Sequence, residues 1–196
     1  VNGSVSGAQE IVVAITGNIN GLEGTSGNPL WQLKKKHEGL LAIDVHPRGK
    51  SFASAGKDGR ILIYDTQTGK ANKIIKAGAQ WIEHIAWSPD GQWLAATNSR
   101  KVIIFDQYGD KKWQTEEHPS TVSAIYWSTN EELAVACYGK VIIYDVINRN
   151  IQQKLEWKGS LVAMILSPDG DIVACGSQDN SVHFWRRSTA RDSMMS

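Results

Sequence analysis

The sequence predicts an all-β fold built from repeated antiparallel sheets, and two observations support this prediction. First, one unit of three strands separated by turns occurs four times, and its copies end in Tyr64, Phe105, Tyr144 and Trp185. Second, these closing aromatic residues are spaced by 41, 39 and 41 residues. A period of about 40 residues with strand character throughout is typical of propeller blades. We therefore expect a β-propeller of four-stranded antiparallel blades, with four complete blades and most of a fifth.

Turn-forming sequences set the expected blade boundaries within the 196 residues. Residues 1–9 are rich in glycine and serine without periodicity, so they are expected to form an irregular N-terminal end. Residues 10–36 contain three apolar or mixed stretches and are expected to form a partial blade that lacks its innermost strand. The other expected blades are 37–78, 79–118, 119–158 and 159–196, the last with a weak outer strand, in one propeller domain or fragment.

The third strand of each unit is a nearly continuous apolar run, as in Ile61–Ile63, Val102–Ile104 and Val141–Ile143. Blades pack face to face, so both faces of a middle strand are buried. The expected fourth strands, such as Lys70–Lys73, are mixed in character. This composition suits an outer edge that faces solvent, where charge also discourages edge-to-edge pairing.

The composition argues against several kinds of partner. Lysine and arginine total 21 against 20 acidic residues, and this net charge of +1 gives no electrostatic reason to expect nucleic acid. No stretch approaches the ~18 consecutive apolar residues of a membrane span, so no membrane partner is expected. The two cysteines, Cys137 and Cys175, have no disulfide or ligand spacing, which favours the cytoplasm.

The titratable residues show no catalytic or metal-binding pattern. The five histidines are scattered over different units without the spacing of paired metal ligands. Aspartates recur at turn positions such as Asp58, Asp90 and Asp179, where carboxylates cap backbone amides. A catalytic pair should be singular to one site. We therefore predict no catalytic residue, no metal, no cofactor and no enzymatic activity.

The Ser-Pro-Asp-Gly turn at 88–91, the Gly-Ser-Gln-Asp loop at 176–179 and the closing Val-His-Phe-Trp at 182–185 resemble the WD-repeat β-propeller family. The resemblance covers about residues 10–196, and it makes the chain a divergent member. Propellers of that family usually close into a ring of about seven blades. This chain supplies fewer, so self-association is expected if the ring is incomplete.

In that family a histidine before the first strand, a serine or threonine in the second, an aspartate in the next loop and a tryptophan in the third form a hydrogen-bonded set. The resemblance implies such a set in the 37–78 blade, with a phenol in place of the indole. For the expected 119–158 blade, it places His118 at the histidine position, and Tyr138 replaces the aspartate there. The implied set in the 37–78 blade is His37, Ser54, Asp58 and Tyr64.

The sequence favours a non-catalytic scaffold that binds a protein or peptide through loops at one mouth of the central channel. Residues before the inner strands differ between blades while the strands repeat, as a recognition surface requires. Trp81 either caps a blade seam or is the main anchor, and Glu83 is expected to face the channel from the same strand. The other predicted partner-binding residues are Trp157, Lys158, Lys57, Gln178, His37 and His118.

Two other functions remain open at this point. The spacings Gly27-x-x-x-Trp31 and Gly109-x-x-x-Trp113 are similar to the blade-docking motif of quinoprotein propellers, which leaves a quinoprotein-like dehydrogenase as one alternative. In that family the tryptophan stacks between blades, so even a true match is structural. The eight tryptophans leave a carbohydrate-binding propeller as the other alternative.

Overall fold

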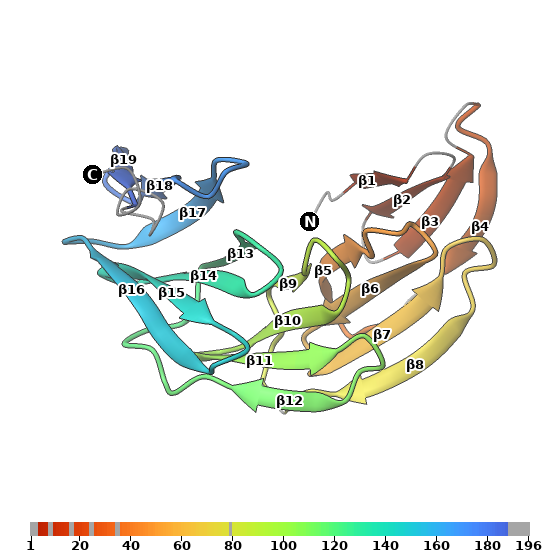
Figure 1. The fold of residues 1–196 in the computed structure, drawn as a ribbon. Coiled ribbons are helices and arrows are strands. Elements are labelled where there is room, and N and C mark those ends of the chain that lie inside the picture. Colours follow the sequence, from red (N-terminus) through yellow and green to blue (C-terminus); the bar gives the residue numbers. More distant parts are fainter. Residues whose placement is uncertain are drawn as a thin grey trace. The chain divides into compact units, whose positions relative to one another are not determined.

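The computed structural model describes residues 4–7, 10–15, 18–23, 26–33, 36–78 and 80–187, and in this part of the chain the secondary structure consists of strands and turns (Figure 1). The chain divides into two compact units, Val1–Glu116 and Glu117–Ser196. Three sheets belong to the first unit and two to the second.

The first unit contains three four-stranded antiparallel sheets, in each of which neighbours in sequence pair with one another. The first sheet consists of β1 (Ser4–Gly7), β2 (Glu10–Ile15), β3 (Asn18–Glu23) and β4 (Pro29–Leu33). The second consists of β5 (Leu40–Val45), β6 (Ser51–Gly56), β7 (Arg60–Asp65) and β8 (Ala71–Lys76). The third consists of β9 (Ile85–Trp87), β10 (Trp93–Asn98), β11 (Lys101–Asp106) and β12 (Lys111–Gln114).

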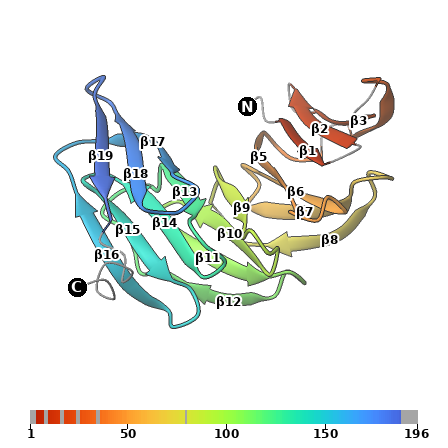
Figure 2. The ribbon, with the colours of Figure 1, turned by 45° about the horizontal axis from the view of Figure 1, so that its top comes forward.

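The second unit continues the same pattern of antiparallel meanders (Figure 2). One sheet consists of β13 (Ala124–Trp127), β14 (Glu132–Cys137), β15 (Lys140–Asp145) and β16 (Asn150–Glu156). The other consists of β17 (Leu161–Leu166), β18 (Ile172–Ser177) and β19 (Val182–Arg186). The predicted fold class, four-stranded antiparallel propeller blades, is confirmed. The weak outer strand predicted for the last blade, at 191–196, lies outside the described residues.

The prediction for the N-terminus is wrong, because Ser4–Gly7 forms a strand where an irregular end was expected. This strand pairs antiparallel with β2, with Val5 opposite Val12 and Ser6 opposite Ile11. The first blade therefore has its innermost strand. Its composition gives little sign of this, because strand formation depends on the neighbouring strand more than on intrinsic preference.

Trp81 and Glu83 were predicted to lie in the inner strand of the third blade. This strand begins only at Ile85, so residues 81–84 lie outside it. The side chain of Thr97 explains the difference. Its hydroxyl oxygen accepts hydrogen bonds from the backbone N–H groups of Glu83 (3.2 Å) and His84 (3.0 Å). These amides are therefore satisfied by a side chain, which competes with the backbone ladder. The strand placement predicted for Glu83 is accordingly wrong.

Blades pack through one repeated type of face, which we call the leading face because it contacts the next blade along the chain. In the β5–β8 blade, Ile61 and Ile63 lie on this face and pack against the β9–β12 blade. In the β13–β16 blade, Val141 and Ile143 do the same against the β17–β19 blade. Within these apolar clusters the second strand contributes only small residues to the leading face, which lets the sheets approach closely. These small residues are Ala53 and Ala55 in one blade and Ala134 and Ala136 in the other.

Candidate functional site

A buried hydrogen-bonded set stiffens the β5–β8 blade. His37 Nδ1 lies 3.0 Å from Asp58 Oδ1, and its Nε2 lies 2.7 Å from the hydroxyl oxygen of Ser54. The side chain of Arg60 donates to Asp58 at 2.6 Å. Burial by itself would raise the pKa of Asp58, but the hydrogen bonds from His37 and Arg60 outweigh it and bring this pKa below its ordinary value. Tyr64 is fully buried in the same blade, but its hydroxyl has no hydrogen-bond partner among the described residues, so this member of the implied set is held by packing.

The other histidine with a family position is also internal. His118 is buried, and its Nε2 lies 3.0 Å from the hydroxyl oxygen of Tyr144, with which it shares a hydrogen bond. Tyr138, at the loop position where an aspartate stands in other blades, is exposed. Side chains buried in blade interiors do not line a docking surface. We therefore remove His37 and His118 from the predicted binding residues.

Trp31 joins the first blade to the second, as the blade-docking interpretation of its motif requires. Its indole N–H donates to the carbonyl oxygen of Thr66 at 2.7 Å, and its ring stacks on Phe52 with a centroid distance of 5.5 Å. A side chain at Gly69 would place its Cβ 2.7 Å from the indole, and φ at this glycine is +66°. Packing therefore accounts for Trp31 without a ligand.

Trp81 is exposed in the connection between β8 and β9. The residue after it, Ile82, is fully buried and its N–H donates to the carbonyl oxygen of Gly56 at 3.1 Å, so the segment is anchored beneath the indole. The ammonium of Lys57, in the turn between β6 and β7, lies 4.2 Å from the centroid of the Trp81 ring. About half of Trp81 is accessible, with 52% exposure. We call Lys57, Trp81 and the exposed Glu83 the Trp81 surface.

The remaining predicted binding residues belong to the second unit. Trp157 is half-buried, packs against the cluster between the two blades of this unit and contacts the ring of His183. It therefore takes the alternative role of covering a blade seam. Lys158 and Gln178 are exposed, and the N–H of Gln178 donates to the carbonyl oxygen of Ser160 at 2.9 Å. Both side chains are available to a partner.

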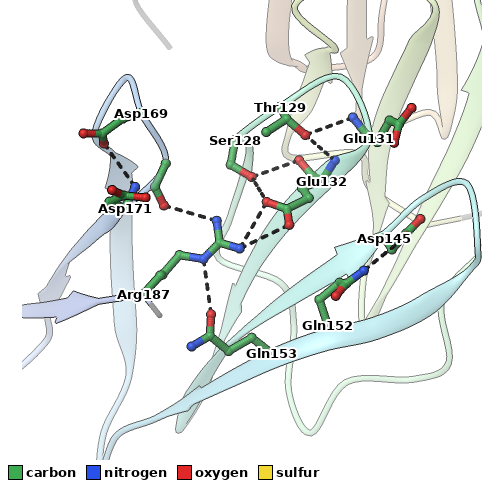
Figure 3. Close-up of polar contacts among 11 residues, drawn as sticks. Ser128, Thr129, Glu131, Glu132, Asp145, Gln152, Gln153, Asp169, Asp171 and Arg187 are labelled. Carbon is green, nitrogen blue, oxygen red and sulfur yellow. Dashed lines mark hydrogen bonds and ion pairs between the residues drawn. The ribbon is translucent and has the colours of Figure 1, made fainter. Parts of the chain in front are cut away.

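The second unit also holds an acidic cavity of about 330 Å³ between its two blades (Figure 3). One cation, Arg187, is among its lining residues and is itself buried. Arg187 donates to Glu132 Oε2 at 3.1 Å, to the carbonyl oxygen of Gly170 at 3.1 Å and to Gln153 Oε1 at 3.2 Å. The carboxylates that line the cavity are Glu131, Glu132, Asp145, Asp169 and Asp171.

Arg187 acts as a connection between the β13–β16 and β17–β19 blades, because its partners come from both. A buried guanidinium is tolerated when its charge and donors are matched in this way. Hydrogen bonds from Asn148 and Gln152 likewise occupy Asp145 and lower its pKa. This network was not predicted from the sequence. Its only signal is the pair Arg186-Arg187 at the end of a third strand, where the other blades have an acidic residue followed by an uncharged one.

Within the described ranges, no group of three or more histidine, cysteine, aspartate or glutamate side chains could hold a metal ion. The same part of the chain has no helix with the length and apolar character needed to cross a membrane.

Comparison with known proteins identifies the family. A family model described as the anaphase-promoting complex subunit 4 WD40 domain matches residues 14–89. A second, described as the WD domain, G-beta repeat, matches residues 151–186. The chain belongs to the WD-repeat family. The two matched segments of this WD-repeat protein lie in different units, so each unit carries the family's sequence pattern.

Several curated proteins are similar to this WD-repeat protein over part of their length. WD repeat-containing protein SL1-17 of Schistosoma mansoni is 28% identical over 157 residues, which cover 78% of this chain and 52% of that protein. Cell division cycle 20.1, cofactor of APC complex, of Arabidopsis thaliana is 25% identical over 68% of this chain and 31% of that protein. Small ribosomal subunit protein RACK1 of Neurospora crassa is 31% identical over 121 residues, which cover 55% of this chain and 37% of that protein. The chain thus spans about half or less of the length of these relatives.

Proposed function

We propose that this WD-repeat protein is a non-catalytic scaffold that binds a protein or peptide partner at the Trp81 surface. The observation that carries the proposal is the exposed Trp81, held above the buried Ile82 and beside Lys57. Tryptophan is the residue type most enriched among those that dominate binding energy, and a rigid setting limits the entropy lost on binding. The packing of the strands does not require an exposed indole. Binding of a partner explains why the Trp81 side chain is exposed.

The names of two relatives support an interaction function. One is called a cofactor of the APC complex and another an MST50-interacting protein, so each is named for acting with other proteins. These names describe those proteins only, and the partner of this chain is a separate question. The cytoplasmic location predicted from the cysteines stays a prediction.

The Trp81 surface indicates the chemistry of its partner. The ammonium of Lys57 lies over the indole ring and leaves the rest of the exposed indole free. An apolar side chain of the partner would bury that remaining area. A carboxylate next to it would pair with Lys57, while Glu83 would repel a second acidic group. We therefore propose a peptide segment that combines one large apolar residue with one acidic residue.

The Trp81→Ala variant is expected to lose about 2 kcal/mol of partner binding, or roughly thirtyfold in affinity, because the main buried contact is removed. The probe is a random peptide library displayed on phage, selected on the full chain after depletion on Trp81→Ala. Enriched peptides are then synthesised, and their dissociation constants are measured by calorimetry with both proteins. The melting temperature of the variant should stay close to that of the parent.

Tyr108→Ala is the matched control, because Tyr108 is an exposed aromatic residue in the same unit but away from the Trp81 surface. It should bind the selected peptides like the parent. Lys57→Ala should weaken binding less than Trp81→Ala and should relax the preference for an acidic residue. Equal binding to parent and Trp81→Ala, together with a lower melting temperature of the variant, would show that Trp81 only covers a seam.

A further inference from the structure

The connection between β8 and β9 is hydrogen-bonded at two points to the turn between β6 and β7. We call its residues 77–78 and 80–84 the Trp81 connection. The N–H of Ala77 donates to the carbonyl oxygen of Gly59 at 3.0 Å, and the N–H of Ile82 donates to that of Gly56 at 3.1 Å. The two acceptors lie at either end of the turn that carries the ammonium group of the Trp81 surface. Two backbone hydrogen bonds therefore fix the indole side of this surface relative to its cation.

The end of β10 holds the same connection through two side chains. The hydroxyl oxygen of Thr97 accepts the N–H groups of Glu83 and His84, at 3.2 and 3.0 Å. The side-chain amide of Asn98 donates to the carbonyl oxygen of Ala77 at 3.2 Å. Consecutive residues of one strand thus hold both ends of the Trp81 connection.

The β9–β12 blade has no copy of the buried polar set that stiffens the β5–β8 blade. Ser54 of that set pairs with Leu62, the third residue of β7. The residue that pairs with Ile103, the third residue of β11, is Ala96. The turn after β10 also contains no aspartate. The family pattern therefore does not account for what holds the Trp81 connection, and the two side chains at the end of β10 do so instead.

We propose that Thr97 and Asn98 are positioning residues of the Trp81 surface, which hold Trp81 and Lys57 in the arrangement that the partner binds. The inference rests on the proposed function, because it assumes that a partner binds this surface. Thr97 is only 2% exposed, so it acts on the partner through the Trp81 connection. A connection that is already ordered loses less conformational entropy when a partner binds. Loosening it should therefore weaken the binding of every selected peptide alike.

Thr97→Val is the test variant, because valine keeps the shape of threonine and removes the hydroxyl acceptor. Amide hydrogen exchange of the full chain should become roughly tenfold faster at Glu83 and His84, whose N–H groups lose their acceptor. Calorimetry with the peptides selected on the parent should show roughly fivefold weaker binding and a less favourable binding entropy. The loss should be equal for peptides with and without an acidic residue, unlike the effect of Lys57→Ala.

Thr115→Val is the matched control for a purely structural effect. Thr115 lies in the same blade, is also 2% exposed, and its hydroxyl oxygen accepts the N–H of Val102 at 3.0 Å. This variant loses the same kind of hydrogen bond outside the Trp81 connection. It should lower the melting temperature about as much as Thr97→Val, with peptide affinity and exchange of the connection like those of the parent. Thr97→Ser keeps the hydroxyl and should restore both readouts.

The exchange and binding measurements separate this proposal from the proposed function. Parent-like exchange in Thr97→Val would overturn the positioning role whether or not a peptide binds. Faster exchange with unchanged affinity would also overturn it, as would an equal loss of affinity in Thr115→Val. If no selected peptide depends on Trp81, the proposed function fails, and the exchange data alone decide whether Thr97 holds the connection. Should Thr97→Val fail to fold, Asn98→Ala takes its place, since Asn98 is only half-buried.

Discussion

The Ile103→Asp variant is expected to lose the fold of residues 1–116. Ile103 lies on β11 and is only 2% exposed, within the apolar cluster between the β5–β8 and β9–β12 blades. Its neighbours in that cluster include Ile61, Ala96 and Phe105. A carboxylate placed there has no partner, and its burial costs several kcal/mol. Domains are stable by only about 5–15 kcal/mol, so soluble yield and the circular dichroism melt should both collapse.

Ile74→Asp is the control for this experiment, since it is the same chemical change at an exposed position on the outer strand β8. Its effect on the melting temperature should be small, because exposed substitutions usually change stability by less than about 0.5 kcal/mol. A parent-like melt of Ile103→Asp would mean that β11 is not enclosed between two sheets. The blade assignment would then be wrong.

Strand positions were predictable where their signal is local. The third strands are visible as apolar runs such as Val102–Ile104, and turns such as 88–91 separate them. The strand Ser4–Gly7 could not be found in this way, because its evidence is the pairing with β2 and its own residues are small or polar. The start of β9 was missed for a related reason. Thr97, more than ten residues away, takes the amides that would have extended it.

The candidate site shows the same division between local and distant information. The set around His37 follows from the family pattern, whereas the sequence left open whether Trp81 is exposed or covers a blade seam. Only the burial of His37 in the structure shows that its side chain is unavailable to a partner. The Arg187 network joins residues 55 positions apart, Arg187 and Glu132, so spacing within one repeat carries no sign of it.

The Asp44→Asn variant is expected to be more stable than the parent at neutral pH. Asp44 lies on β5, and its carboxylate accepts a hydrogen bond of 2.7 Å from the backbone N–H of Trp87 on β9, so it bridges two blades of the first unit. Burial raises the pKa of Asp44 from its ordinary 3.8 to about 6, and the backbone hydrogen bonds only partly oppose this. An asparagine keeps an oxygen for the Trp87 amide and removes the charge of this half-buried carboxylate.

The raised pKa of Asp44 fixes the pH range of the effect. Between about pH 4 and pH 6 the folded parent binds a proton that the unfolded chain has released, so its stability falls as pH rises through this range. Above pH 6 the loss is complete, and it amounts to at most about 3 kcal/mol for a shift of this size. The asparagine side chain of the variant does not titrate. The gain in stability should therefore be greatest at pH 7 and should vanish near pH 4.

Urea unfolding of parent and Asp44→Asn at several pH values measures this difference directly. His46, two residues along the chain, has a pKa lowered by burial. Its contribution is common to both proteins, so it cancels in the difference between them. A stability difference that is the same at pH 4 and pH 7 would show that Asp44 is ionised without penalty. A parent more stable at pH 7 would mean that the charged hydrogen bond to Trp87 outweighs the burial of the carboxylate.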